Sequence, residues 1–215
     1  MLKLKEVMQI IIVIILFAFI ISFPQILKEN NQFIEALVFA FIILAVNILA
    51  KKITAYYYDS KIEQKILHWR RWGYYKRSQL KKPIPIGILL PFLLVWISYP
   101  TGFIKMLTFL QSEITPTSAR VSRRRGGVIQ RHLEMTEFHL SVICGIGIVA
   151  NLVLALVAGI FDYGRLARFS VYFCIWNLLP LGQVDGSKIL FGSKLLWLLL
   201  AVLSVLGLFC AIFFM

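Results

Sequence analysis

The decapeptide NLLPLGQVDG, residues 177–186, places polar and turn-forming residues between two strongly apolar stretches of the chain. Pro180 lacks a backbone donor and ends the apolar segment before it, while Gly182 and Gly186 allow a sharp turn or a close backbone approach. Asp185 then lies near the membrane surface, where an unpaired and desolvated carboxylate is strongly unfavourable. The pattern therefore predicts a cation beside Asp185, which is a metal ion, a lysine or an arginine.

Hydrolysis at zinc commonly uses a His-Glu-x-x-His helix, whose two histidines share one face and whose glutamate deprotonates the attacking water. The chain has three histidines, His68, His132 and His139, and none of them begins such a motif. Glu137, His139 and Cys144 are close in sequence, but their spacing does not place them on one helix face. His132 and His139 are seven residues apart and would share a face if that stretch were helical, which leaves a recruited metal site as an alternative.

The elements that position these residues are long and apolar. Of the 215 residues, 60% are hydrophobic, and a bilayer-spanning helix needs roughly 20 apolar residues in succession. Hydrophobic segments of this kind occupy residues 7–27, 33–50, 84–110, 139–161, 166–180 and 190–215. We therefore expect an integral membrane protein.

The formal charge of +13 is concentrated in two blocks, residues 51–82 and 120–131. Basic residues that flank membrane segments usually stay on the cytoplasmic side, and they also attract anionic lipid headgroups. We therefore expect the N-terminus and two basic loops, residues 51–83 and 111–138, to be cytoplasmic. The second loop contains a proline and a pair of glycines and is compatible with one hairpin. Aromatic residues such as Trp69 and Trp72 among the basic ones suit a headgroup belt, so no nucleic-acid partner is expected.

The segment 84–110 contains three prolines and two glycines, at positions 85, 91, 100, 87 and 102. Proline removes a backbone donor, so one unbroken spanning helix is not expected. If this segment enters and leaves on one side, both basic blocks face the cytoplasm. The predicted fold is a single all-α polytopic membrane domain, residues 1–215, with about five spanning helices and one Pro/Gly-broken re-entrant segment.

The decapeptide resembles a signature of the site-2 proteases, which are intramembrane zinc metalloproteases. The signature reads Asn-x-x-Pro-x-x-x-x-Asp-Gly, and this chain has Asn177, Pro180, Asp185 and Gly186 at the same spacing. The preceding helix of that family often reads Gly-Pro-x-x-Asn, and here the stretch 147–151 has Gly147 and Asn151 with Ile148 in place of the proline. The resemblance implies that Asp185 occupies the position of the third zinc ligand and that the 177–180 stretch lies beside a substrate strand.

The same resemblance places the missing zinc motif at the end of the second hydrophobic segment. There Asn47 and Lys51 occupy the two histidine positions and Ile48 occupies the glutamate position. Isoleucine cannot act as a base, and a protonated lysine has no lone pair for a metal. We hypothesise that Lys51 forms an ion pair with Asp185, with the Asn47 amide beside it, where zinc would otherwise bind. No cofactor is expected on this interpretation.

Three functions are compatible with this sequence. The first is a site-2-protease-like pseudoprotease without catalytic activity, which binds a transmembrane segment of a partner in a groove of Asn151, Asn177, Pro180, Asp185 and Gly186. The second is an active intramembrane zinc metalloprotease with atypical ligands, in which Asp185 would hold the metal. The third is an unrelated small transporter or membrane assembly subunit. Ordinary hydrogen bonding between helices is the alternative role of the two asparagines.

Overall fold

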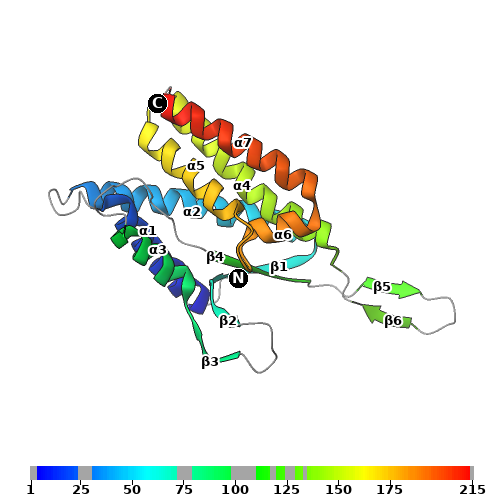
Figure 1. The fold of residues 1–215 in the computed structure, drawn as a ribbon. Coiled ribbons are helices and arrows are strands. Elements are labelled where there is room, and N and C mark those ends of the chain that lie inside the picture. Colours follow the sequence, from blue (N-terminus) through cyan, green and yellow to red (C-terminus); the bar gives the residue numbers. More distant parts are fainter. Residues whose placement is uncertain are drawn as a thin grey trace. The chain divides into compact units, whose positions relative to one another are not determined.

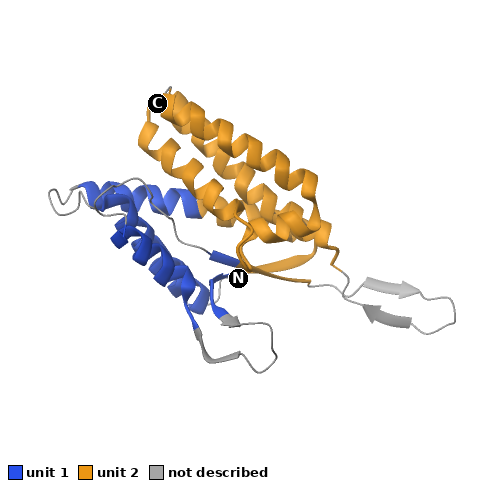
Figure 2. Ribbon diagram, in the orientation of Figure 1, with its two compact units in different colours: residues 1–44, 64–111 blue, residues 45–63, 112–215 orange. Residues whose placement is uncertain are grey.

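The computed structural model describes residues 4–23, 31–71, 79–97, 110–116, 120–123, 129–132 and 135–213. The chain forms two compact units, one of residues 1–44 and 64–111 and the other of residues 45–63 and 112–215 (Figure 2). Helix α2 (Asn31–Tyr57) belongs to both, with its first half in unit 1 and its second half in unit 2.

Unit 1 contains helix α1 (Leu4–Ser22), the antiparallel strands β2 (Trp69–Arg71) and β3 (Gln79–Ile84), and helix α3 (Ile86–Ile97). The rings of Phe19 and Phe92 stack between α1 and α3, with centroids 6.2 Å apart. Helix α3 begins after Pro85 and carries Pro91 inside it. Its 12 residues span about 18 Å, which is short of the roughly 30 Å hydrocarbon core of a bilayer.

The structure describes only the first part of the segment 84–110, which was predicted to be re-entrant. The helical part is too short to span, as the prolines led us to expect. The return of the segment falls on residues 98–109, which lie outside the described residues.

Unit 2 is built on three long helices that pack together, α4 (Glu137–Ile160), α5 (Gly164–Leu178) and α7 (Lys194–Phe213), as Figure 1 shows. The short helix α6 (Asp185–Gly192) contacts all three. Thr136 caps α4, because its side chain accepts a hydrogen bond from the His139 amide. The 177–186 motif therefore covers the end of α5, the turn after it and the start of α6.

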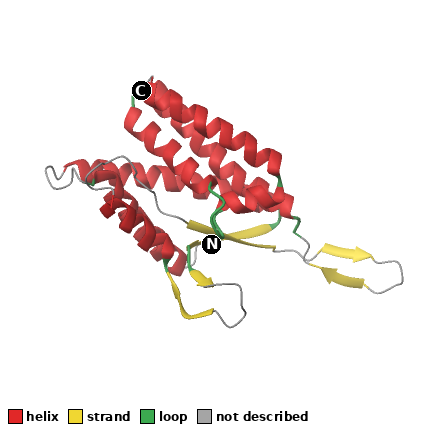
Figure 3. Ribbon diagram, viewed as in Figure 1, coloured by secondary structure: helices red, strands yellow, loops and turns green. Residues whose placement is uncertain are grey.

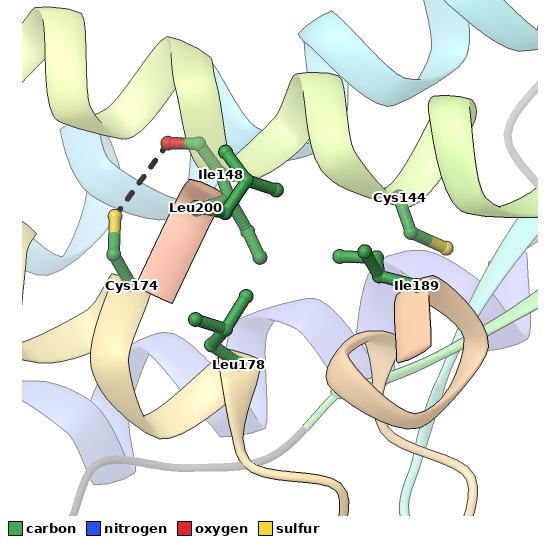
Figure 4. Close-up of a cluster of buried hydrophobic side chains, with 6 residues drawn as sticks. All are labelled: Cys144, Ile148, Cys174, Leu178, Ile189 and Leu200. Carbon is green, nitrogen blue, oxygen red and sulfur yellow. Dashed lines mark hydrogen bonds between the residues drawn. The ribbon is translucent and has the colours of Figure 1, made fainter. Parts of the chain in front are cut away.

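A buried apolar cluster joins the four helices of unit 2 (Figure 4). The thiol of Cys174 donates to the carbonyl of Ile148 at 3.6 Å, which links α5 to α4. Both cysteines of the cluster are free thiols, so they serve as small packing residues. The members of the cluster are Cys144, Ile148, Cys174, Leu178, Ile189 and Leu200.

Four helices of the described chain are long and apolar enough to cross a membrane, namely α1, α2, α4 and α7. Helix α5, expected as a further span, has 15 residues, whereas about 20 are usual for a span. Large apolar side chains lie exposed along α4 and α7, for example Val153, Leu156, Leu199 and Leu206. These features indicate an integral membrane protein.

The prediction of an all-α chain is wrong in one respect, because the described residues also contain six strands (Figure 3). They lie almost entirely in the regions 51–83 and 111–138, which were expected to be loops, the second of them compatible with one hairpin. Besides β2 and β3, the strands are β1 (Ser60–Ile66), which pairs with β4 (Leu110–Pro116), and β5 (Arg120–Arg123), which forms an antiparallel hairpin with β6 (Ile129–His132).

The burial pattern of β1 shows that a stretch rich in charged residues can form a strand and not a loop. Every second residue of Ser60–Ile66 is buried and the residues between them are more exposed, which is the two-residue period of a strand with one covered face. The β6 strand also removes an alternative metal site. Because His132 ends a strand and His139 lies in the first turn of α4, the two do not share a helix face.

Gly192, at the end of α6, lies in close contact with the start of α4. A Cβ on Gly192 would lie 2.3 Å from the carbonyl oxygen of Glu137 and 2.7 Å from Cβ of Ser141. Gly192→Ala should therefore destabilise the protein by about 1–3 kcal/mol, because backbone must move. The matched control is Gly207→Ala in α7, where the nearest atom is 3.6 Å away and alanine favours the helix by up to about 1 kcal/mol. Unfolding in mixed detergent micelles measures both, and equal stability of the two variants would contradict the packing.

Candidate buried ion-pair site

The side chains of Lys51 and Asp185 form an ion pair inside unit 2. Lys51 comes from the last two turns of α2, and Asp185 is the first residue of α6. The ammonium donates a hydrogen bond to Oδ2 of Asp185, and the two side chains are only 2% and 1% exposed. This is the pair that the sequence hypothesis named.

The turn before α6 fixes the position of Asp185. Helix α5 ends at Leu178, and the chain turns through Gly182, whose φ of +62° is a left-handed conformation that favours glycine. A Cβ on Gly186 would lie 2.2 Å from the Leu178 carbonyl oxygen. Only glycine lets α6 start this close to the end of α5, and so Asp185 is directed into the bundle.

Gly147 on α4 provides the space for the lysine. A Cβ at Gly147 would lie 2.5 Å from Cε of Lys51 and 3.1 Å from the Asn47 amide nitrogen. That nitrogen donates to the Gly147 carbonyl at 2.9 Å. Asn47 and Lys51, one helical turn apart, therefore both face α4, and Ile48 is buried beside them.

A second lysine and a serine complete the site. Lys188, one turn after Asp185 on α6, donates to the main-chain carbonyl of Ser112 in β4. Lys51 also donates to the hydroxyl of Ser112, at 3.4 Å, and this serine is fully buried. Two ammonium groups and one carboxylate thus converge from α2 and α6, and Ser112 of β4 lies between the two lysines.

The electrostatics favour an ionised aspartate. Asp185 lies outside the four helices that are long enough to span a membrane. Burial by itself acts to raise the pKa of Asp185, but the ammonium groups of Lys51 and Lys188 outweigh it and the pKa lies below its usual value. The second carboxylate oxygen, Oδ1, has no hydrogen-bond partner among the described residues.

The remaining residues of the predicted groove have different environments. Asn151 and Asn177 are buried, while Pro180 is exposed on the turn. The Asn177 amide donates to the Phe173 carbonyl of its own helix at 3.2 Å. The Asn151 amide is fully buried, and neither its nitrogen nor its oxygen has a hydrogen-bond partner among the described residues.

The residues present do not suit a zinc ion. Among the described residues, no three His, Cys, Asp or Glu side chains gather in a group that could hold a metal. At Asp185 the nearest cation is the ammonium of Lys51, which offers no lone pair while protonated. A metal would have to displace this ammonium and find further ligands.

Two members of the site, Ser112 and Lys188, were missed as site residues at the sequence level. Lys188 follows Asp185 by three residues, so a helix over this stretch places both on one face, and that spacing was a usable signal. Ser112 carries no such signal, because only the packing of β4 brings it to α2 and α6.

Comparison of the chain with protein-family models, with curated proteins and with solved structures gives no match. The resemblance to site-2 proteases therefore rests on two stretches of this sequence, residues 147–151 and 177–186.

A double-mutant cycle measures the ion pair. Removing one partner strands a buried charge, so Lys51→Met and Asp185→Asn should each destabilise unit 2 by about 3–5 kcal/mol. The double variant should lose less than the sum of the single variants, because neither Lys51 nor Asp185 is then left without its partner, and Lys188 keeps its bond to the Ser112 carbonyl. Unfolding titrations in mixed micelles give the free energies. Lys194→Met, at an exposed lysine, is the control, and additive losses would contradict a direct pair.

The two asparagines that face the bundle should respond in opposite directions to the same substitution. Asn151→Leu removes an amide without partners and should stabilise the protein by about 1–2 kcal/mol. Asn47→Leu removes the bond to the Gly147 carbonyl and should destabilise it by a similar amount. Thermal unfolding in detergent tests both, and a loss of stability in Asn151→Leu would show that this amide has a partner in solution.

Proposed function

We propose that this chain is a catalytically inactive relative of the site-2 proteases that binds a transmembrane segment of a partner protein without cleaving it. The observation that carries the proposal is the Lys51–Asp185 ion pair. An ammonium stands where the sequence resemblance puts a metal ion, so the carboxylate keeps a cation beside it while the means of activating water are lost.

The neighbours of the pair support the loss of catalysis. Ile48 is in the position of the general base and is buried against the bundle. An isoleucine side chain cannot take a proton from water, and an ammonium in contact with a carboxylate cannot polarise a peptide carbonyl as a metal does. On this proposal the chain keeps the buried aspartate and its cation but lacks the metal ion and the general base that hydrolysis needs.

Retained polar groups support a binding role. Oδ1 of Asp185 and the Asn151 amide are buried acceptors and donors without partners among the described residues. Such groups usually have a cost in stability, so a group of this kind in a native structure calls for an explanation, and a bound segment would provide one. Main-chain groups of an extended segment supply both donors and acceptors.

The orientation in the membrane forms part of the same proposal. The N-terminus and the basic regions 51–83 and 111–138 would face the cytoplasm, since cationic flanks favour that side. Lys188 and Lys194, at the same end of unit 2 as the end of α2, would then lie near anionic headgroups.

Site-specific photo-crosslinking tests the binding function. A photoreactive residue at Leu181, within the 177–186 turn, should form discrete adducts with membrane proteins of uncleaved length. The control is the same residue at Val205 on α7, because Leu181 and Val205 are both 48% exposed. Adducts with cleaved products, or equal adducts from both positions, would contradict specific binding without cleavage.

Metal binding distinguishes the inactive protein from an active protease with atypical ligands. The purified chain should retain no stoichiometric zinc after dialysis, whereas the triple variant Asn47→His, Ile48→Glu, Lys51→His should bind one cobalt or zinc ion per chain. Asp185→Ala in the triple variant should remove that ion. One zinc per unmodified chain, lost on Asp185→Ala, would instead favour the enzyme.

A further inference from the structure

The Lys51–Asp185 pair is not accessible in this structure, which raises the question of how a partner reaches it. Both side chains are nearly fully buried. Among the groups that cover them is Ser112, which lies within hydrogen-bond distance of Lys51 and is itself fully buried. Displacement of Ser112, and of the strand that carries it, would uncover one side of the pair.

Strand β4 is held by main-chain and side-chain contacts from several elements. Lys188 of α6 binds the Ser112 carbonyl, and Lys51 of α2 binds its hydroxyl. Ile114 packs against the apolar cluster of α4 to α7, and the Thr115 hydroxyl donates to the Lys61 carbonyl of β1 at 3.4 Å. The lysine contact to a carbonyl is independent of the side chain at position 112.

We propose that β4 is an internal occupant of the binding site, and that a partner's extended segment replaces it at Lys188. This inference rests on the proposed function. The ammonium of Lys188 would release the Ser112 carbonyl and take a main-chain carbonyl of the partner, and a strand of the partner would take the position of β4.

The chemistry of the contact suits such an exchange. A carbonyl oxygen is present at every residue of any polypeptide, so the partner can offer Lys188 the same acceptor that Ser112 offers. The Ser112 side chain contributes a hydrogen bond to the Asp185 carboxylate, and an incoming main-chain amide can replace that bond. The two ammonium groups also exceed the single carboxylate in charge, which favours a segment that presents carbonyl oxygens or a carboxylate.

Cysteine labelling measures the release of β4. Ser112→Cys keeps the carbonyl that Lys188 binds, and in a Cys210→Ser background the remaining native cysteines are buried. A water-soluble maleimide should modify Cys at position 112 slowly. Adding Lys188→Met should raise the rate roughly tenfold, as expected for the loss of one charge-assisted hydrogen bond. Lys194→Met is the matched control and should leave the rate unchanged.

A second variant frees β4 without changing either lysine. Ile114→Ala removes the apolar anchor of the strand, so it should raise both the labelling rate at position 112 and the yield of partner adducts from Leu181. If adducts form but neither variant changes labelling, β4 is a fixed part of the site and the exchange is wrong, while the proposed function stands. If no adducts form in any variant, both proposals fail.

Discussion

A carboxylate buried in an apolar helical bundle needs a cation, and this requirement organises unit 2. Asp185 is fully buried, and desolvation of an isolated charge there would outweigh much of the stability of a small domain. Lys51 meets the requirement from the end of α2 and Lys188 contributes from within α6. The ends of α2, α5 and α6 must therefore remain together, whatever the protein does.

Small residues make this arrangement possible, because charged side chains reach the centre only where backbones come close. Gly186 allows α6 to start against the end of α5, and Gly147 leaves room on α4 for the stem of Lys51. Asn47 then spans from α2 to the Gly147 carbonyl. The site is rigid for the same reason, since each of these contacts would be broken by a single added methyl group or a lost amide.

The ion pair also separates two properties that an active metalloprotease combines. A metal ion neutralises buried carboxylates and activates water at the same time, whereas an ammonium performs only the first task. A protein that exchanges the metal for lysine keeps the bundle, the turn and the polar acceptors, but loses the reaction. This contrast is the physical basis of the proposal that the chain binds a partner without cleaving it, and Ser112 of β4 lies beside the Lys51 ammonium.

The sequence by itself determined the features that follow from local chemistry. The apolar runs indicated the long helices, the prolines at 85 and 91 indicated that residues 84–110 do not begin as a spanning helix, and the Asn-Pro-Asp-Gly spacing indicated a turn whose acid needs a cation. The resemblance to site-2 proteases then led to Lys51, which occupies the second histidine position of the zinc motif. Apart from one hairpin in residues 111–138, the strands in the basic regions were missed, and in β1 charge concealed the two-residue period. Only the tertiary structure decided that Ser112 joins the site, that Lys188 binds its carbonyl, and that Asn151 is buried without a partner among the described residues. These facts depend on contacts between residues far apart in the chain, and such contacts leave no periodic or local signal from which they can be read.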